Sequence, residues 1–148
     1  MRISAKGRYA LAAIIEVARS SRSKETVAVI AIAQKLGISK IYLEQIFSQL
    51  KKSELLLSTK GSHGGYILAS PPQGITAWDV LSAVEAMLVE PTEASVGKEA
   101  PEIEMALQNV VFQPLDKVVR ECLKKITLQS LLDFSEKQRL EQAYMLNM

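Results

Sequence analysis

Two short amphipathic segments, separated by three residues, constrain this chain more than any other feature. Apolar residues recur at helical spacing from Val29 to Leu36 and again from Leu43 to Leu50. Between them stands Gly37-Ile38-Ser39, in which the glycine favours the end of one helix and the serine the start of the next. A short helix, a tight turn and a second amphipathic helix are typical of the helix-turn-helix, whose second helix enters the DNA major groove.

The flanking segments complete this motif. A further amphipathic stretch predicts a helix over residues 4–20, with Ser4 as its N-cap. Strand-like runs at 55–59 and 66–69 surround the glycine-rich segment 60–65, which predicts a β-hairpin. The expected fold is therefore mainly α with a small β-hairpin wing, a winged helix-turn-helix followed by a long dimerisation helix.

Two prolines and a glycine at 71–74 close this unit, so we expect a DNA-binding domain over 1–72 and a helical dimerisation and regulatory region over 73–148. Thr76 and Asp79 have the spacing of a capping box and predict a helix reaching Leu88. Residues 89–101 lack periodicity and are expected to form a mobile loop.

A long helix is expected from about Glu102, with a kink or break at Pro114. Thr127 is expected to cap a short helix, followed by an apolar tail over 141–148. An apolar seam runs along the long helix and predicts packing against a partner helix, within the chain or across a homodimer. The seam residues are Leu107, Val111, Leu115, Val118 and Cys122.

Composition narrows the function. Residues 1–70 hold eleven Lys or Arg and four Glu, while residues 71–148 hold seven basic and twelve acidic residues, so the first half would attract a polyanion. One cysteine and one histidine exclude an intrachain disulfide and provide too few ligands for a Cys/His metal site. We therefore expect no metal, no cofactor and no enzymatic activity.

The longest apolar run, 27–33, is far below the roughly 20 residues of a membrane span. The basic start is followed by an interrupted apolar stretch that contains Glu16, so it does not resemble a signal peptide. A cytoplasmic protein without a membrane partner is expected.

Three groups of residues are candidates for contact with double-stranded DNA. The recognition-helix group is Ser39, Lys40, Tyr42, Glu44, Gln45 and Ser48. The wing group is Lys60, Ser62, His63 and Gly64, and the group at the start of the first helix is Ser4, Lys6, Arg8 and Tyr9. Each has a simpler interpretation as a solvated surface, and for His63 an exposed turn residue is the favoured one.

Cys122 is expected to be a small buried hydrophobe and Trp78 to pack in the core or an interface.

Four motifs in order resemble the Rrf2 family of bacterial winged-helix transcription regulators. They are residues 1–10 (MRISAKGRYA), 42–47 (YLEQIF), 61–68 (GSHGGYIL) and 75–80 (ITAWDV). The resemblance covers residues 1–88 closely and the remainder loosely. It is strongest to the cluster-free, cysteine-metabolism repressor type, because the cysteines of the cluster-binding members are absent and the ending QAYM is similar to that repressor's tail.

The resemblance implies a homodimeric repressor that exchanges its long helix between subunits and binds a pseudo-palindromic operator. It places Glu44 and Gln45 near bases and Lys60 in a groove, where relatives commonly carry arginine. It further implies that no iron–sulfur cluster is bound and that cysteine synthase is a partner. The alternative function is a winged-helix protein assembly module whose basic face binds an acidic partner, and dependence on DNA sequence would separate the two.

Overall fold

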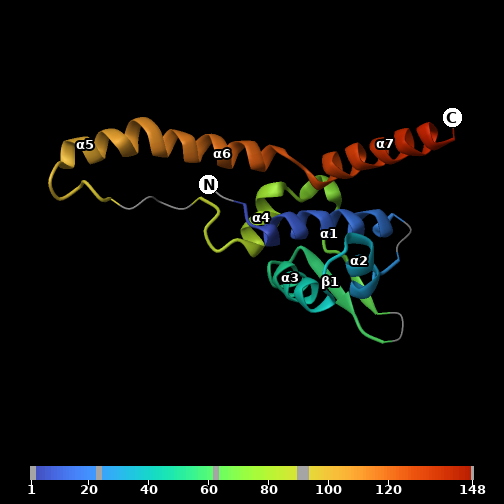
Figure 1. Cartoon of the computed structure of the whole chain (residues 1–148). Helices are drawn as coiled ribbons and strands as arrows, with labels where there is room; N and C mark the ends of the chain where they lie inside the picture. The colour runs from blue at the N-terminus through green and yellow to red at the C-terminus, as the bar shows by residue number, and fades with distance from the viewer. Residues whose placement is uncertain (1–2, 23–24, 62–63, 90–93, 148) are drawn as a thin grey trace.

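The computed structural model describes residues 3–22, 25–61, 64–89 and 94–147, and most of them are helical. The winged-helix elements α1–α4 and the hairpin form a body, α7 lies across it, and α5, η2 and α6 extend away as an arm (Figure 1). In chain order the elements are α1 (Ala5–Ser21), α2 (Val29–Leu36), α3 (Lys40–Lys52), β1 (Leu56–Thr59), β2 (Gly65–Leu68), η1 (Pro72–Gly74), α4 (Ala77–Val84), α5 (Pro101–Ala106), η2 (Leu107–Phe112), α6 (Gln113–Lys125) and α7 (Leu128–Leu146). The predicted fold class is confirmed.

The helix-turn-helix is built by its caps. Gly37 ends α2 in the left-handed conformation, with φ of 68°, which glycine adopts without steric penalty. The Ser39 hydroxyl accepts a hydrogen bond from the Tyr42 N–H and so starts α3. Because only Ile38 lies between these two caps, α3 is held at a fixed angle to α2.

The wing is an antiparallel pair in which Leu56 faces Leu68 and Thr59 faces Gly65. Val27 extends it by exchanging two backbone hydrogen bonds with Tyr66, at 3.0 and 2.9 Å. A Cβ on Gly65 would stand 2.4 Å from the Val27 carbonyl oxygen, so only glycine permits this close backbone approach. The hairpin is thereby fastened to the segment that leads into α2.

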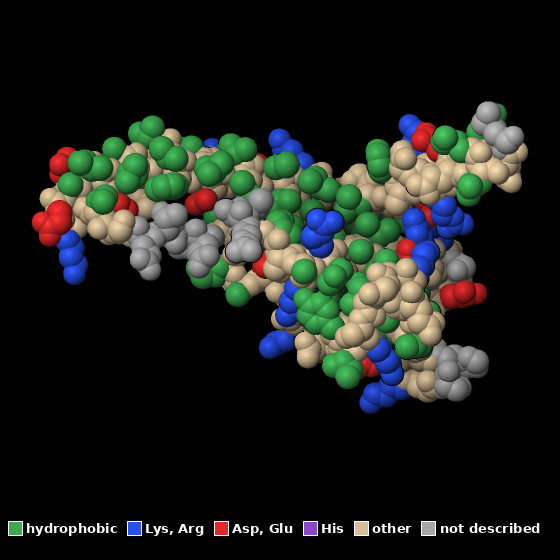
Figure 2. Space-filling view, in the orientation of Figure 1, with side chains coloured by type: hydrophobic (Ala, Val, Ile, Leu, Met, Phe, Trp, Pro, Cys, Tyr) green, Lys and Arg blue, Asp and Glu red, His purple; other side chains and the backbone are tan. Residues whose placement is uncertain are grey.

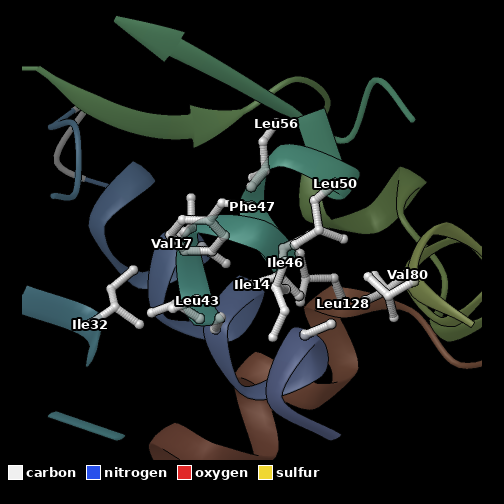
Figure 3. Packing of buried hydrophobic residues seen from close by; sticks show 14 of the residues in the cluster. Ile14, Val17, Ile32, Leu43, Ile46, Phe47, Leu50, Leu56, Val80 and Leu128 are labelled. Atoms are coloured by element: carbon white, nitrogen blue, oxygen red, sulfur yellow. The ribbon is translucent and has the colours of Figure 1, made fainter. Parts of the chain in front are cut away.

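A single apolar cluster joins α1, α3, α4 and α7 (Figure 3). Ile14, Phe47 and Leu50 are fully buried, and Val80 and Leu128 are 1% exposed. The cluster therefore uses residues on both sides of position 72, where we placed the boundary between two regions. That boundary remains a prediction, and the core itself is shared.

The fourth helix is shorter than predicted. Its capping box is present, since Thr76 Oγ1 accepts from the Asp79 N–H and the Asp79 carboxylate accepts from the Thr76 N–H. The helix ends at Val84 and not at Leu88, because Glu85 turns to an extended conformation with ψ of 131°. Leu88 is still 5% exposed, so its apolar character reflects burial outside a helix.

The arm is a continuous helical run from Pro101 to Lys125, within which η2 has π-helical hydrogen bonds. Pro114 does not end the helix, so of the expected kink or break the break is wrong, and the irregularity in the helix is the π turn before the proline. A proline ring crowds the carbonyl four residues earlier and has no N–H to donate, and the wider π turn before it accommodates both effects. Within the expected loop 89–101, residues 90–93 lie outside the described residues.

The last helix is longer than predicted. The expected short helix and apolar tail form one helix, α7, capped by the Thr127 hydroxyl. Its first half packs on the body through Leu128 and Leu132, each 1% exposed, and Arg19 of α1 pairs with Glu136 at 2.7 Å. The second half projects past the body, which explains why sequence periodicity there gave no consistent buried face (Figure 1).

Candidate nucleic-acid interface

Helix α3, the predicted recognition helix, has one buried and one open face. Leu43, Ile46, Phe47 and Leu50 are fully buried in the core. The open face shares a shallow hollow with the start of α1. The hollow is lined by Lys6, Ile41, Glu44, Gln45, Ser48 and Gln49. The structure thus brings three predicted recognition residues together with Lys6, which is 38 positions or more earlier in the sequence.

On the open face of α3, a lysine and a glutamate of the same helix partly neutralise each other. The Lys40 ammonium lies 3.7 Å from the Glu44 carboxylate, one helical turn away, and both side chains are about half exposed. Such an exposed pair contributes little to stability. Lys40 can therefore exchange Glu44 for a phosphate or a base edge at small cost, and Glu44 can then accept from a base edge.

Aromatic contact fixes α1 against α3. The rings of Tyr9 and Tyr42 meet edge to face with centroids 5.9 Å apart. Tyr9 remains 37% exposed at the edge of the core. Both predicted residues thus have a packing role that holds the two helices of the candidate interface in register.

Ser4 is engaged within the molecule. Its N–H and its hydroxyl both donate to Glu85 Oε1, at 2.9 and 2.7 Å, and its Oγ accepts from the Gly7 N–H. In the structure Ser4 therefore anchors the start of α1, which is a different role from the predicted phosphate contact. Arg8, in the first turn of α1, is exposed.

Two described residues of the predicted wing group, Lys60 and Gly64, stand at the tip of the hairpin. Lys60 is exposed beside Gly61, whose φ is 105°. A Cβ on Gly64 would lie 2.7 Å from the Thr59 carbonyl oxygen, so this residue shapes the turn. Two members of the predicted wing group, Ser62 and His63, lie outside the described residues.

The predicted seam of the arm is open to solvent. Leu107, Val111, Leu115 and Val118 are 36–62% exposed, and Cys122 is exposed as well. The expectation that Cys122 is a buried hydrophobe is wrong for the single chain, because its side chain is exposed together with the other seam residues. Apolar side chains cover much of the arm in Figure 2.

Sequence reasoning missed one contact at the base of the arm. Arg120 and Lys124 of α6 lie over the Trp78 ring of α4, at 5.5 and 5.6 Å from its centroid. Because more than 40 residues separate the ring from the cations, no local pattern could reveal this contact. It links α6, at the base of the arm, to α4 of the body.

Among the described residues, no helix has the length and apolar character to cross a membrane. Nor does any group of three or more His, Cys, Asp or Glu in that part of the chain form a possible metal site.

Comparison with known proteins agrees with this geometry. The family model Rrf2, described as an iron-dependent transcriptional regulator, matches residues 3–133. The chain is 34% identical to the transcriptional regulator CymR of Bacillus subtilis over 98% of both chains. It is 38% identical to the regulator IscR of Sodalis glossinidius over 92% of this chain and 81% of that protein.

The solved structure of CymR, the global cysteine regulator of Bacillus subtilis, superimposes with a TM-score of 0.73 at 33% identity. It covers 90% of this chain and 98% of CymR. These relatives are transcriptional regulators and not enzymes. The chain accordingly belongs to the Rrf2 family of DNA-binding transcriptional regulators.

Proposed function

We propose that this protein represses transcription as a homodimer that binds a pseudo-palindromic operator. The observation that carries the proposal is the shared hollow of α1 and α3, where Lys6 stands beside Glu44, Gln45 and Ser48. Lysine supplies a phosphate or guanine contact, while glutamine and glutamate match adenine and cytosine edges in the major groove. Lys60 on the wing would reach the adjoining groove.

The homodimer is supported by the arm. Its seam exposes apolar side chains over several helical turns, and isolated helices of this kind are normally covered by a partner helix. A second copy supplies an identical seam, and two-fold symmetry would then place two α3 helices on two related half-sites. The operator is pseudo-palindromic for the same reason.

The residues do not fit the iron–sulfur cluster of some relatives. The chain has one cysteine and one histidine, and Cys122 lies on the seam of α6. Clusters of this type require several thiolate or imidazole ligands at one place. We therefore propose a regulator without a cluster or other cofactor, and without catalytic activity.

Similarity to CymR, the global cysteine regulator of Bacillus subtilis, supports a role in cysteine regulation, and we propose cysteine synthase as the partner because the ending QAYM resembles the tail of the cysteine-metabolism repressor. The end of α7 is available for it, since Tyr144, Met145 and Leu146 are 71–87% exposed. Titration of the protein with purified cysteine synthase tests this step. A Tyr144→Ala variant should lose the heat of binding, whereas no heat with the unchanged protein would exclude the partner.

The DNA-binding proposal is tested by selecting bound duplexes from a random pool, followed by fluorescence anisotropy at two salt concentrations. One enriched pseudo-palindrome is expected, together with a linear loss of log affinity against log salt, about 0.9 per neutralised phosphate. Lys6→Ala should weaken binding and lower this slope by about one. Lys137→Ala, which removes an exposed lysine of α7, is the matched control.

Enrichment of no sequence would overturn operator binding and favour the protein assembly module. Repression itself is tested with a reporter gene behind the selected operator. Expression should rise when the regulator gene is deleted, and a fall would indicate activation.

A further inference from the structure

Within the open face of α3, one residue is chemically unlike its neighbours. Ile41 stands in the first turn and is 72% exposed. It lines the same hollow as the polar side chains of Glu44, Gln45 and Ser48. In α3, which the structure describes completely, Ile41 is the one large apolar side chain that is mostly exposed. Its environment in the free protein is therefore water and polar groups.

The folded chain offers no reason for an isoleucine at this position. A β-branched residue is a weaker helix former than alanine or a long polar residue, because its χ1 angle is restricted in a helix. Ile41 is not part of the buried cluster or of the apolar residues packed against it. An apolar side chain at the start of a recognition helix is instead placed where base edges are contacted.

We infer that Ile41 reads the 5-methyl group of a thymine in each operator half-site. This inference rests on the proposed function. The thymine methyl is the apolar group that base pairs present in the major groove, and aliphatic side chains recognise it by contact. Polar side chains fill the rest of the hollow, so Ile41 supplies the contact that matches a methyl group.

Gln45 is a second side chain of the hollow that can contact a base edge. It lies one helical turn after Ile41, and side chains at this spacing have Cβ atoms about 5–6 Å apart. A glutamine amide pairs with the N6 and N7 atoms of adenine in the major groove. Together the two side chains select an A·T base pair or two adjacent A·T pairs, so each half-site contains an adenine contact beside a thymine methyl contact.

The experiment removes single methyl groups from the DNA. Each thymine of the selected operator is replaced in turn by deoxyuridine, which keeps its base pairing, and binding is measured by anisotropy. At one thymine in each half-site the replacement should weaken binding of the unchanged protein about fourfold, the effect of burying one methyl group. Replacement in both half-sites should multiply these factors.

Variants assign the methyl contact to Ile41. With Ile41→Ala the ratio of thymine to deoxyuridine affinity should fall to about one at that position, while Ile41→Val should retain most of it. Ile30→Ala, which truncates a 45% exposed isoleucine of α2, should leave the ratio unchanged.

Two results would overturn the inference. The first is an affinity ratio near one at every thymine for the unchanged protein, and the second is a ratio that Ile41→Ala leaves intact. Both require sequence-specific binding to be present, so they are distinct from failure of the proposed function, in which no operator is enriched at all.

Discussion

The body and the arm both contain amphipathic helices, but the apolar faces of these helices are buried in the body and exposed in the arm. In the body the apolar face of α3 is fully buried, while in α5, η2 and α6 no residue is buried. The difference lies in what each face meets. The helices of the body and α7 surround one cluster, whereas the arm extends past them with its seam in solvent (Figures 1 and 2).

Helical periodicity therefore predicts that a face will be covered, but not which chain covers it. The free energy of unfolding that the buried core gives the body is a property of one chain and does not depend on protein concentration. In the proposed homodimer, the free energy gained by covering the seam of the arm would require a second molecule and would follow mass action. The following variants test this contrast.

The largest effect is expected in the core of the body. Phe47→Ala should lower the free energy of unfolding by about 3–5 kcal/mol, because a fully buried ring leaves a cavity. Urea denaturation at two protein concentrations should give the same loss. Phe134→Ala, at a 65% exposed site on α7, should stay within about 0.5 kcal/mol. A loss below 1 kcal/mol at Phe47 would contradict the packing described here.

In the arm, the double variant Val111→Glu, Leu115→Glu should weaken self-association about 100-fold or more. Burial of each apolar side chain is worth about 1.5–3 kcal/mol, and the added charges repel each other across the seam. Sedimentation velocity measures the change, and circular dichroism should show an intact fold. The control pair Asn109→Glu, Gln113→Glu adds equal charge on the opposite side of the same turns. Equal association of both pairs would remove the arm as the interface.

A smaller effect is expected where the body meets the segment leading to the arm. In Gly7→Ala the added Cβ would stand 2.4 Å from Glu85 Oε1, which must move and release Ser4. The net loss of stability should be about 1 kcal/mol, since crowding costs about 1–3 kcal/mol and better helix propensity offsets part of it. Thermal unfolding measures it, with Gly74→Ala as the control in open space. A stabilised Gly7→Ala protein would refute the contact.

The smallest effect is expected at the base of the arm. Arg120→Gln and Lys124→Gln should each cost about 0.5–1 kcal/mol by removing a cation from the face of Trp78. Trp78 is the single tryptophan, so its emission spectrum reports the change directly. Lys125→Gln should leave the spectrum unchanged, and an identical spectrum in all three variants would exclude the contact.

Much of the body could be predicted because its signals are local. The caps at Gly37, Ser39 and Thr76 depend on residues within one turn, and so does the alternation around the glycine-rich hairpin. Glu44, Gln45 and Ser48 of the α3 hollow were also predicted, since the outward face follows from the buried one, whereas Ile41 and Gln49 were not among the predicted contacts. Lys6 was predicted as a phosphate contact, but its position beside α3 became visible only in the fold.

The remaining features depend on contacts between distant segments. The hydrogen bonds from Ser4 to Glu85 cross 81 positions, and they explain both the early end of α4 and the engagement of Ser4. Arg19 of α1 pairs with Glu136 in the first half of α7, a contact across more than 100 positions that no local pattern reveals. Pro114 was overestimated as a helix breaker because a π turn can accommodate it.

Two segments of the chain, one just before α4 and one just before α7, are hydrogen-bonded to each other, and this pairing bears on how the length of the arm can vary. Ala77 donates to the Ile126 carbonyl at 2.8 Å and Leu128 donates to the Ile75 carbonyl at 2.7 Å, so the excursion between them, which holds α4 as well as the arm, begins and ends at one point. A loop closed at its base can gain or lose whole helical turns without pulling on the body, each turn adding about 5.4 Å. Because α4 keeps its place in the core through Val80 and Val84, such a change of length is confined to the arm that follows it.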